Sequence, residues 1–269
     1  MASTRRILCQ LPISMPFETF KPYYDLLQRD YDLVKRPDTE TQIRDVPTGL
    51  SKPDLFSYFG LSLAQDREIL KSMLRAEQEG FDAIAGACVF DGAIRAAGNL
   101  MNIPVVGPGE TSMYLAKMMG EHFAIITSDP SFTFKIEHHM EQLGMRPFAI
   151  GYRPVRSLSL GPEKFFGCCL GTDYSPVIEN FSQIARGCIQ DGADVLIAGC
   201  GLMSPMFTVS NVRDIDGVPI IDPMLVSLKV AEMLVDFRAA GIPIISSKGL
   251  FMKATKGDIE EGCKALGLI

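Results

Sequence analysis

The chain has 269 residues, of which 47% are hydrophobic and 22% are charged, and its net charge is -6 at pH 7. These values are typical of a globular enzyme with one large domain or two smaller ones. The scattered lysines and arginines form no basic patch of the kind that binds nucleic acid. No apolar run reaches the roughly 18 to 20 residues of a membrane span, and Met1–Leu11 lacks the long apolar segment of a signal peptide. We therefore expect a cytoplasmic protein with a small-molecule substrate and with no nucleic-acid or membrane partner.

The sequence contains no complete motif for binding a metal or a cofactor. The seven cysteines include no C-x-x-C pair, and an odd number in a chain of this length argues against a disulfide framework. The three histidines, His122, His138 and His139, have no second cluster of ligands, so no metal site is predicted. The segment 107–109, Gly-Pro-Gly, lacks the third glycine of a dinucleotide-binding loop. We expect no cofactor.

Strand patterns alternate with helical patterns along the chain. The expected strands are 7–11, 31–34, 83–88, 103–106, 123–127, 195–198 and 219–221. The expected helices are 20–29, 66–79, 112–119, 134–143, 178–190 and 225–239. This alternation predicts an α/β fold with parallel sheets covered on both faces. Two stretches rich in Pro and Gly, 36–58 and 154–174, are predicted to be long loops, which are usually functional or mobile.

An internal repeat is the most informative pattern. The sequence EGFDAIAGAC at 79–88 aligns with DGADVLIAGC at 191–200, and the glycine, aspartate and cysteine are identical. Downstream, IPVVGP at 103–108 aligns with VPIIDP at 218–223. The matches follow one another in order and nearly in register, so the sequence predicts two related halves.

The repeat places Cys88 and Cys200 at matching positions, each after an apolar strand and before a helix. In parallel sheets, ligands bind beyond the carboxyl ends of the strands, and a nearby helix N-terminus lowers the pKa of a thiol. If the halves face each other, one thiolate could remove a proton from a carbon next to a carbonyl while the opposite thiol returns one. The stereocentre would thereby be inverted. Backbone N–H groups after each cysteine would hold the enolate oxygen, the candidates being Val89, Phe90, Gly201 and Leu202.

The structural interpretation of these cysteines is that they are small core hydrophobes, as buried cysteines often are. A single cysteine at a strand end would be interpreted in that way, but a matched pair favours a functional role. The remaining cysteines have no partner in the repeat and are expected to be structural: Cys9, Cys168, Cys169, Cys188 and Cys263.

Several segments resemble the aspartate/glutamate/hydantoin racemase superfamily, and most of all its hydantoin and allantoin racemase branch. They are DAIAGACVFDGAIRAA at 82–97, PVVGPGETSMYL at 104–115, FAIITS at 123–128, ADVLIAGCGLM at 193–203, and 218–234. The resemblance implies two pseudo-symmetric Rossmann-like lobes with parallel sheets and an active site in the cleft between them. Lobe 1 would be residues 1–121 with 225–269, and lobe 2 residues 122–224. It also implies a homo-oligomeric, cofactor-independent racemase or epimerase with Cys88 and Cys200 as acid and base. Its substrate would be a hydantoin-like cyclic ureide or an amino-acid derivative.

The resemblance further implies substrate-binding positions in four loops. They are Pro12, Ser14, Val89, Phe90, Asp91, Thr127, Ser128, Gly201 and Leu202. Two of these loops depart from the family. Hydantoin racemases carry an Asn-Pro-Asn-Thr-Ser-like first loop where this chain has LPISM at 11–15, and Phe-Gly-Asp-Pro-Gly after the first cysteine where this chain has VFDG at 89–92. The less polar first loop points to a substrate with an apolar group or a weaker anion.

Two other functions stay open at this point. Maleate cis-trans isomerases of the same superfamily also use two cysteines, one of them as a nucleophile that adds to the double bond. Arylmalonate decarboxylases keep only one cysteine, so the retained pair argues against them. A two-lobed α/β protein could also be a non-catalytic small-molecule binder that closes around its ligand.

Overall fold

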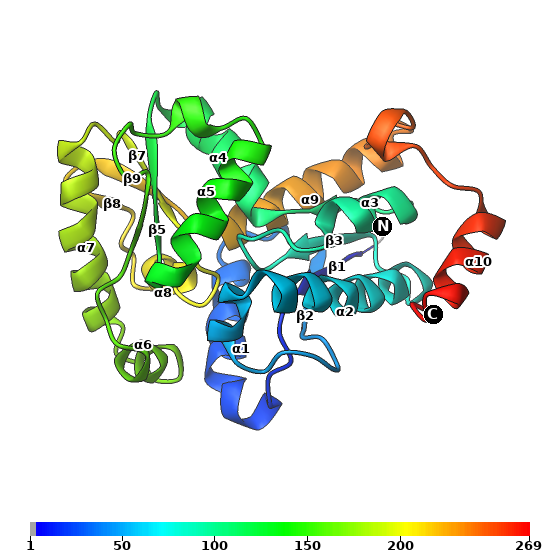
Figure 1. Ribbon diagram of the computed structural model, residues 1–269, viewed down its shortest axis with the longest axis horizontal. Helices are drawn as coiled ribbons and strands as arrows, with labels where there is room; N and C mark the ends of the chain where they lie inside the picture. Colours follow the sequence, from blue (N-terminus) through cyan, green and yellow to red (C-terminus); the bar gives the residue numbers. More distant parts are fainter. Residues whose placement is uncertain (1–3) are drawn as a thin grey trace.

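The computed structural model describes residues 4–269 and contains two parallel-stranded sheets, each flanked by helices (Figure 1). The first sheet has the order β2-β1-β3-β4, from β1 (Arg5–Gln10), β2 (Thr39–Arg44), β3 (Ala83–Gly86) and β4 (Val105–Val106). The second has the order β6-β5-β7-β9, from β5 (Phe123–Thr127), β6 (Val155–Ser157), β7 (Val195–Ala198) and β9 (Val218–Ile221), with the short antiparallel β8 (Asp214–Ile215) at its edge. Both sheets share one strand order, which confirms the predicted fold class.

Helices connect and cover the strands. Those of the first half are α1 (Phe17–Asp32), α2 (Phe59–Gln78), α3 (Ile94–Leu100) and α4 (Pro108–Met119). The second half adds α5 (Thr133–Gln142), α6 (Pro162–Cys169), α7 (Ser175–Gln190), α8 (Ser204–Val209), α9 (Pro223–Ala239) and α10 (Lys256–Ala265). The short 3-10 helices are η1 (Pro53–Ser57), η2 (Pro130–Phe132), η3 (Arg146–Phe148) and η4 (Gly249–Phe251). Within residues 4–269, no helix has both the length and the apolar character that crossing a membrane requires.

The predicted strand at 31–34 is wrong, because α1 continues to Asp32. Tyr23, Leu27 and Tyr31 are buried at a spacing of four residues, so Tyr31 belongs to the apolar stripe of a helix. The long loops predicted at 36–58 and 154–174 are also corrected. The first contains β2 and η1, and the second contains β6 and α6.

Both missed strands lie at sheet edges, where a strand pairs on one side only. An edge strand keeps polar side chains in contact with water, so β2 (TETQIR) and β6 (VRS) do not show the apolar pattern of a buried strand. The strands β3, β5 and β7 are buried throughout, and the apolar pattern predicts them. The observed bounds of β5 and β7 coincide with the predicted ones.

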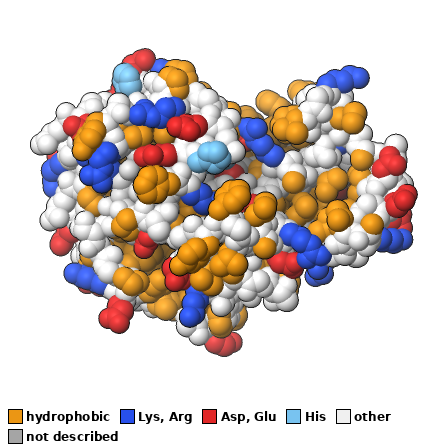
Figure 2. All heavy atoms as spheres, in the orientation of Figure 1, with side chains coloured by type: hydrophobic (Ala, Val, Ile, Leu, Met, Phe, Trp, Pro, Cys, Tyr) orange, Lys and Arg blue, Asp and Glu red, His pale blue; other side chains and the backbone are white. Residues whose placement is uncertain are grey.

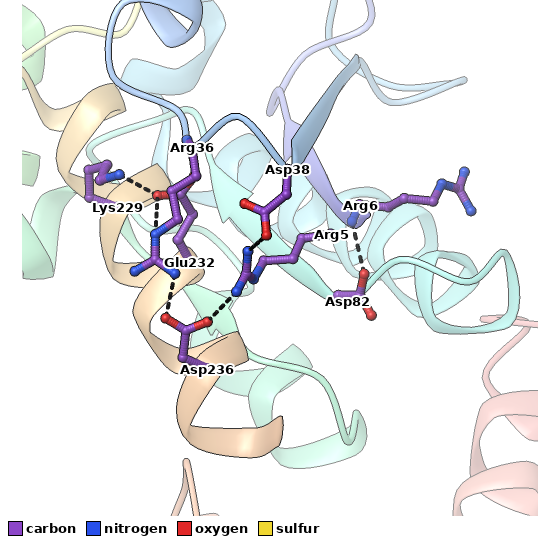
Figure 3. A network of polar contacts seen from close by, with 8 residues as sticks. All are labelled: Arg5, Arg6, Arg36, Asp38, Asp82, Lys229, Glu232 and Asp236. Atoms are coloured by element: carbon purple, nitrogen blue, oxygen red, sulfur yellow. Dashed lines mark hydrogen bonds and ion pairs between the residues drawn. The ribbon is translucent and has the colours of Figure 1, made fainter. Parts of the chain in front are cut away.

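A charged network holds α9 against the first sheet, although this helix follows the second sheet in the sequence (Figure 3). Arg5 of β1 pairs with Asp38 and, at 2.8 Å, with Asp236 of α9. The backbone N–H of Arg36 donates to the wholly buried Glu232 at 2.8 Å. These residues lie at the amino ends of β1 and β2, away from the carboxyl ends where a ligand site is expected. The predicted domain bounds place α9 in lobe 1, and the exact bounds stay a prediction.

Two other helices complete the arrangement. At the C-terminus, α10 lies beside α2 (Figure 1), and Cys263 of α10 packs in one apolar cluster with Leu74 of α2. Helices α2 and α5 approach each other where Lys135 hydrogen-bonds to Ser62. Phe59 and Phe134, near this junction, are each 78% exposed. The face seen in Figure 2 carries hydrophobic side chains interspersed with charged ones.

A buried pair of carboxyl groups lies where α1, α8 and α9 meet. Asp222 caps α9 by accepting from the N–H of Met224 at 2.9 Å, and it also accepts from the hydroxyl of Thr208 at 2.8 Å. Asp30 of α1 is fully buried, and no donor group bonds to either of its oxygens. Burial and the neighbouring Asp222 raise the pKa of Asp30 to about 9. The raised pKa favours the protonated form of Asp30, which avoids two buried carboxylates side by side.

This pair predicts an alkaline loss of stability that an amide would remove. A carboxyl group whose pKa is higher in the folded than in the unfolded state makes stability fall as pH rises from about 4, its unfolded pKa, toward its folded pKa. Asp30→Asn keeps a donor to Asp222 but cannot titrate. We expect the stability of wild type relative to D30N to fall between pH 5 and 8, measured by urea unfolding. Asp32→Asn, two residues away and exposed, is the control and should not remove this decline; a constant difference between wild type and D30N would contradict the interpretation.

Candidate active site

The two cysteine loops meet between the sheets. Cys88 and Cys200 each follow the carboxyl end of a central strand by two residues, β3 in the first sheet and β7 in the second. The backbones around them approach closely, because a Cβ added at Gly201 would lie 2.6 Å from the carbonyl oxygen of Ala87. Tyr23 of α1 also donates to the carbonyl of Gly201 at 3.2 Å. Loops from the two sheets are therefore in contact at the place where the repeat put the thiols.

Both cysteines line one cavity of about 130 Å³. All but two of the residues predicted from the sequence line it as well. Those that do are Pro12, Cys88, Val89, Phe90, Thr127, Ser128, Cys200, Gly201 and Leu202. The cavity thus joins the carboxyl ends of both sheets, as parallel α/β folds require of a ligand site.

Ser14 and Asp91 are the two predicted residues that do not line this cavity. The carboxylate of Asp91 accepts the backbone N–H groups of Gly109 at 2.9 Å and of Glu110 at 2.6 Å, at the positive end of α4. It also lies 2.9 Å from Nε2 of His139 on α5. Asp91 therefore anchors the loop after Cys88.

The sequence did not single out the aromatic wall of the cavity. Phe56 comes from η1, Phe132 from η2, and Phe165 and Phe166 from α6, and all of them line the cavity. The ring of Phe90 lies edge-on to Phe132 with centroids 5.2 Å apart. Phe56, Phe165 and Phe166 belong to the stretches predicted to be loops, where no periodicity marks an inward face. The only available signal was the irregularity of those stretches itself.

The charge of the lining is equally informative. In the part of the chain that the structure describes, no Lys, Arg or His lines the cavity, and the two charged residues that do are Asp54 and Asp129. Asp129 is engaged locally, because it accepts the N–H of Ser131 at 2.8 Å at the start of η2. An anionic ligand would therefore touch no cation that could offset its desolvation. The lining therefore favours a neutral ligand with apolar surface.

Burial has the largest effect on the pKa of both thiols, and it raises both values. It raises the pKa of Cys88 to about 12, against a hydrogen bond from the backbone N–H of Phe90. It also raises the pKa of Cys200, against hydrogen bonds from Ser128 and from the N–H of Leu202. The lowered pKa expected from a helix N-terminus is wrong for this site. The effect of a helix end fades within one turn, and α3 begins only at Ile94, beyond a further loop.

The close approach at Gly201 gives the first test of this geometry. Gly201→Ala would place a methyl group against backbone, which cannot move aside as a side chain can. We expect a loss of about 1–3 kcal/mol in the free energy of unfolding, as is usual when atoms are forced into a packed site. Urea denaturation measures it. Gly262→Ala in α10 is the control, because a Cβ there meets nothing within 4 Å, and it should raise helix stability by up to about 1 kcal/mol. Equal effects of the two substitutions would contradict the close contact.

The model of the family described as Asp/Glu/Hydantoin racemase matches residues 38–231. A hydantoin racemase of Pseudomonas sp. (strain NS671) is 29% identical over 199 residues, which cover 74% of this chain and 76% of that protein. A hydantoin racemase of Paenarthrobacter aurescens is 28% identical over 170 residues, which cover 62% of this chain and 67% of that protein.

Solved structures agree in fold. An allantoin racemase from Klebsiella pneumoniae superposes with a TM-score of 0.74 at 20% identity, over 94% of each chain. An allantoin racemase from Pseudomonas fluorescens superposes with a TM-score of 0.75 at 20% identity, over 93% of this chain and 97% of that one. At these identities the likeness establishes the two-lobed fold, and the sequence match establishes the family.

Proposed function

The chain belongs to the Asp/Glu/hydantoin racemase family and is an isomerase of the racemase type, and we propose that Cys88 and Cys200 are its two proton-transfer groups. One observation carries the proposal. The two cysteines that the repeat matches lie on loops from different sheets and line the same cavity. Each half of the molecule thus contributes one thiol to one ligand site.

The proposed reaction needs only these two groups and the backbone. One cysteine, as thiolate, takes the proton from the carbon next to a carbonyl, and the electron pair of the broken C–H bond moves into an enolate. The other cysteine, as thiol, gives its proton to the opposite face of that carbon, which inverts the centre. The first cysteine is then a thiol and the second a thiolate, so the reverse direction uses them in exchanged roles. Because the thiols supply both acceptor and donor, we propose that the reaction requires no cofactor.

The character of the cavity indicates the substrate class. We propose a neutral cyclic ureide of the hydantoin type, the substrate class named for two relatives. A hydantoin ring places a carbonyl beside the stereocentre and carries no carboxylate. The absence of Lys, Arg and His among the lining residues described supports this choice. A maleate-type isomerase would have to desolvate two carboxylates in the same cavity, where the lining offers them no cation to contact and includes two acids, Asp54 and Asp129.

Single-cysteine variants test the two roles separately. Removing one proton-transfer group should slow racemisation by a factor of about 10² to 10⁴. The two enantiomers of 5-(2-methylpropyl)hydantoin are followed singly, by circular dichroism for inversion and by NMR for uptake of deuterium from heavy water. Cys88→Ser should still exchange the proton of one enantiomer without inverting it, and Cys200→Ser should do so for the other enantiomer only.

The control for these variants is Cys188→Ala, which removes a buried thiol of α7 outside the cavity. It should racemise both enantiomers at the wild-type rate. Full racemisation by either C88S or C200S would rule out the two-thiol reaction. A covalent adduct on Cys88 with maleate, seen by mass spectrometry, would instead favour the addition chemistry of a cis-trans isomerase.

The raised pKa of Cys88 predicts the pH dependence of the rate. Because burial raises this pKa to about 12, the thiolate fraction should increase about tenfold for each pH unit over the neutral and mildly alkaline range. We expect log(kcat/KM) to rise with pH at a slope near one between pH 6.5 and 9, after subtraction of the spontaneous rate. A bell-shaped profile with a maximum near pH 7 would show that the reacting thiol has a pKa close to neutral.

A further inference from the structure

Helix α5 of the second half reaches the loop after Cys88 with two side chains one turn apart. Lys135 places its Nζ 4.3 Å from the ring centroid of Phe90. His139, four residues on, lies 2.9 Å from the carboxylate of Asp91. Residues four apart share one face of a helix, so a single face of α5 holds two consecutive residues of this loop. We refer to residues 88–91 as the Cys88 loop.

The surroundings of Lys135 make it an unusual cation. Its ammonium also lies 5.6 Å from the centroid of Phe56, so two aromatic residues of the cavity wall face it. It donates to the hydroxyl of Ser62 on α2. No carboxylate of the described residues 4–269 lies within 4.0 Å of its nitrogen. Burial lowers the pKa of Lys135, whereas Cys88 and Asp66 of α2 raise it from a longer distance. No directly paired anion of the described chain cancels its charge.

The Cys88 loop is held from its own half as well. Asp91 has a left-handed backbone, with φ of 51°, a conformation that persists only where the surroundings fix it. Its carboxylate fits against the start of α4 because residues 107 and 109 are glycines. A Cβ at Gly107 would lie 2.6 Å from the Asp91 carboxyl group, and one at Gly109 would lie 2.2 Å from the carbonyl of Val89. The Gly-Pro-Gly segment therefore makes room for the Cys88 loop.

We propose that Lys135 and His139 are positioning residues for Cys88, with Lys135 favouring the thiolate and His139 fixing the loop through Asp91. The proposal rests on the proposed function, in which Cys88 transfers a proton. A positive charge in a poorly solvated wall stabilises a nearby thiolate. In keeping with this geometry, the charge of Lys135 lowers the pKa of Cys88 against the larger effect of burial.

The matching contact on the other side is of a different chemical kind. Helix α1 follows β1 as α5 follows β5, and its Tyr23 donates to the carbonyl of Gly201 in the loop after Cys200. Each half therefore uses the helix after its first strand to hold the cysteine loop of the other half. Tyr23 is neutral, whereas Lys135 is a cation. Cys200 accepts from the hydroxyl of Ser128 instead. The two thiols thus receive unequal electrostatic support.

Thiol reactivity tests the role of Lys135 without any substrate. Cys88 in the intact protein is alkylated with iodoacetamide over a range of pH, and its modification is followed by peptide mass spectrometry. Lys135→Met removes the charge but keeps the length of the side chain. We expect K135M to react about tenfold more slowly at a given pH, because a unit charge in such a wall moves a pKa by about one unit. Lys135→Arg should react at the wild-type rate.

Catalysis gives the second readout. K135M and His139→Gln should each lower kcat about tenfold while KM stays within about twofold, since both act on Cys88 and neither lines the cavity. Only K135M should also slow the alkylation of Cys88. The controls are Lys117→Met, a lysine 5.1 Å from the Phe148 ring on α4, and His138→Gln, the exposed neighbour of His139. Both should behave as wild type.

The outcomes separate this proposal from the proposed function. If K135M alkylates at the same rate as K117M, Lys135 does not act on Cys88 and the proposal is wrong. If wild type racemises no hydantoin but K135M still slows alkylation, the positioning role stands and the proposed substrate does not. If K135M unfolds, K135R decides the question, because a requirement for charge is met by arginine and a requirement for the shape of lysine is not.

Discussion

The contact between the carbonyl of Ala87 and the backbone at Gly201 determines the rest of the site. Parallel strands send their carboxyl ends in one direction, so each sheet has a single edge at which loops gather. Joining the two edges at this one point places Cys88 and Cys200 on the same cavity. The charged network on α9 ties the second half back to the amino ends of the first sheet, and leaves the carboxyl ends free for the ligand.

The elements that the sequence predicted well are those whose burial leaves a pattern. The strands β5 and β7 are fully buried, so their apolar runs begin and end where the strands do. Edge strands carry no such signal, so the polar sequence of β2 favours a loop when considered alone. The prediction of the end of α1 is wrong for another reason. Four residues at 31–34 fit a strand when considered alone, and only the helical spacing from Tyr23 identifies them as the end of a helix.

The candidate site divides in the same way. The two cysteines can be identified from the sequence because they occupy matching positions in the internal repeat. The aromatic wall comes from short elements that have no counterpart in the repeat. Asp91 lies in the loop after Cys88 as the sequence indicates, but its side chain does not line the cavity. Its left-handed backbone turns the carboxylate toward α4. The pKa values of the two thiols cannot be predicted from the residues that neighbour them in the sequence. These values depend on how much water the closed cavity excludes, and that is a property of the whole fold.

Unequal support of the two thiols has a thermodynamic consequence for a racemase. Mirror-image molecules have the same free energy in water, so the equilibrium constant between them is one whatever the enzyme does. The ratio of kcat/KM in the two directions must then also be one. Lys135 against the Cys88 loop and Ser128 beside Cys200 cannot favour one hand of the product. They can only change kcat and KM together in each direction, so that tighter binding comes with slower turnover. The two duplicated halves can therefore diverge in sequence without shifting the equilibrium of the reaction.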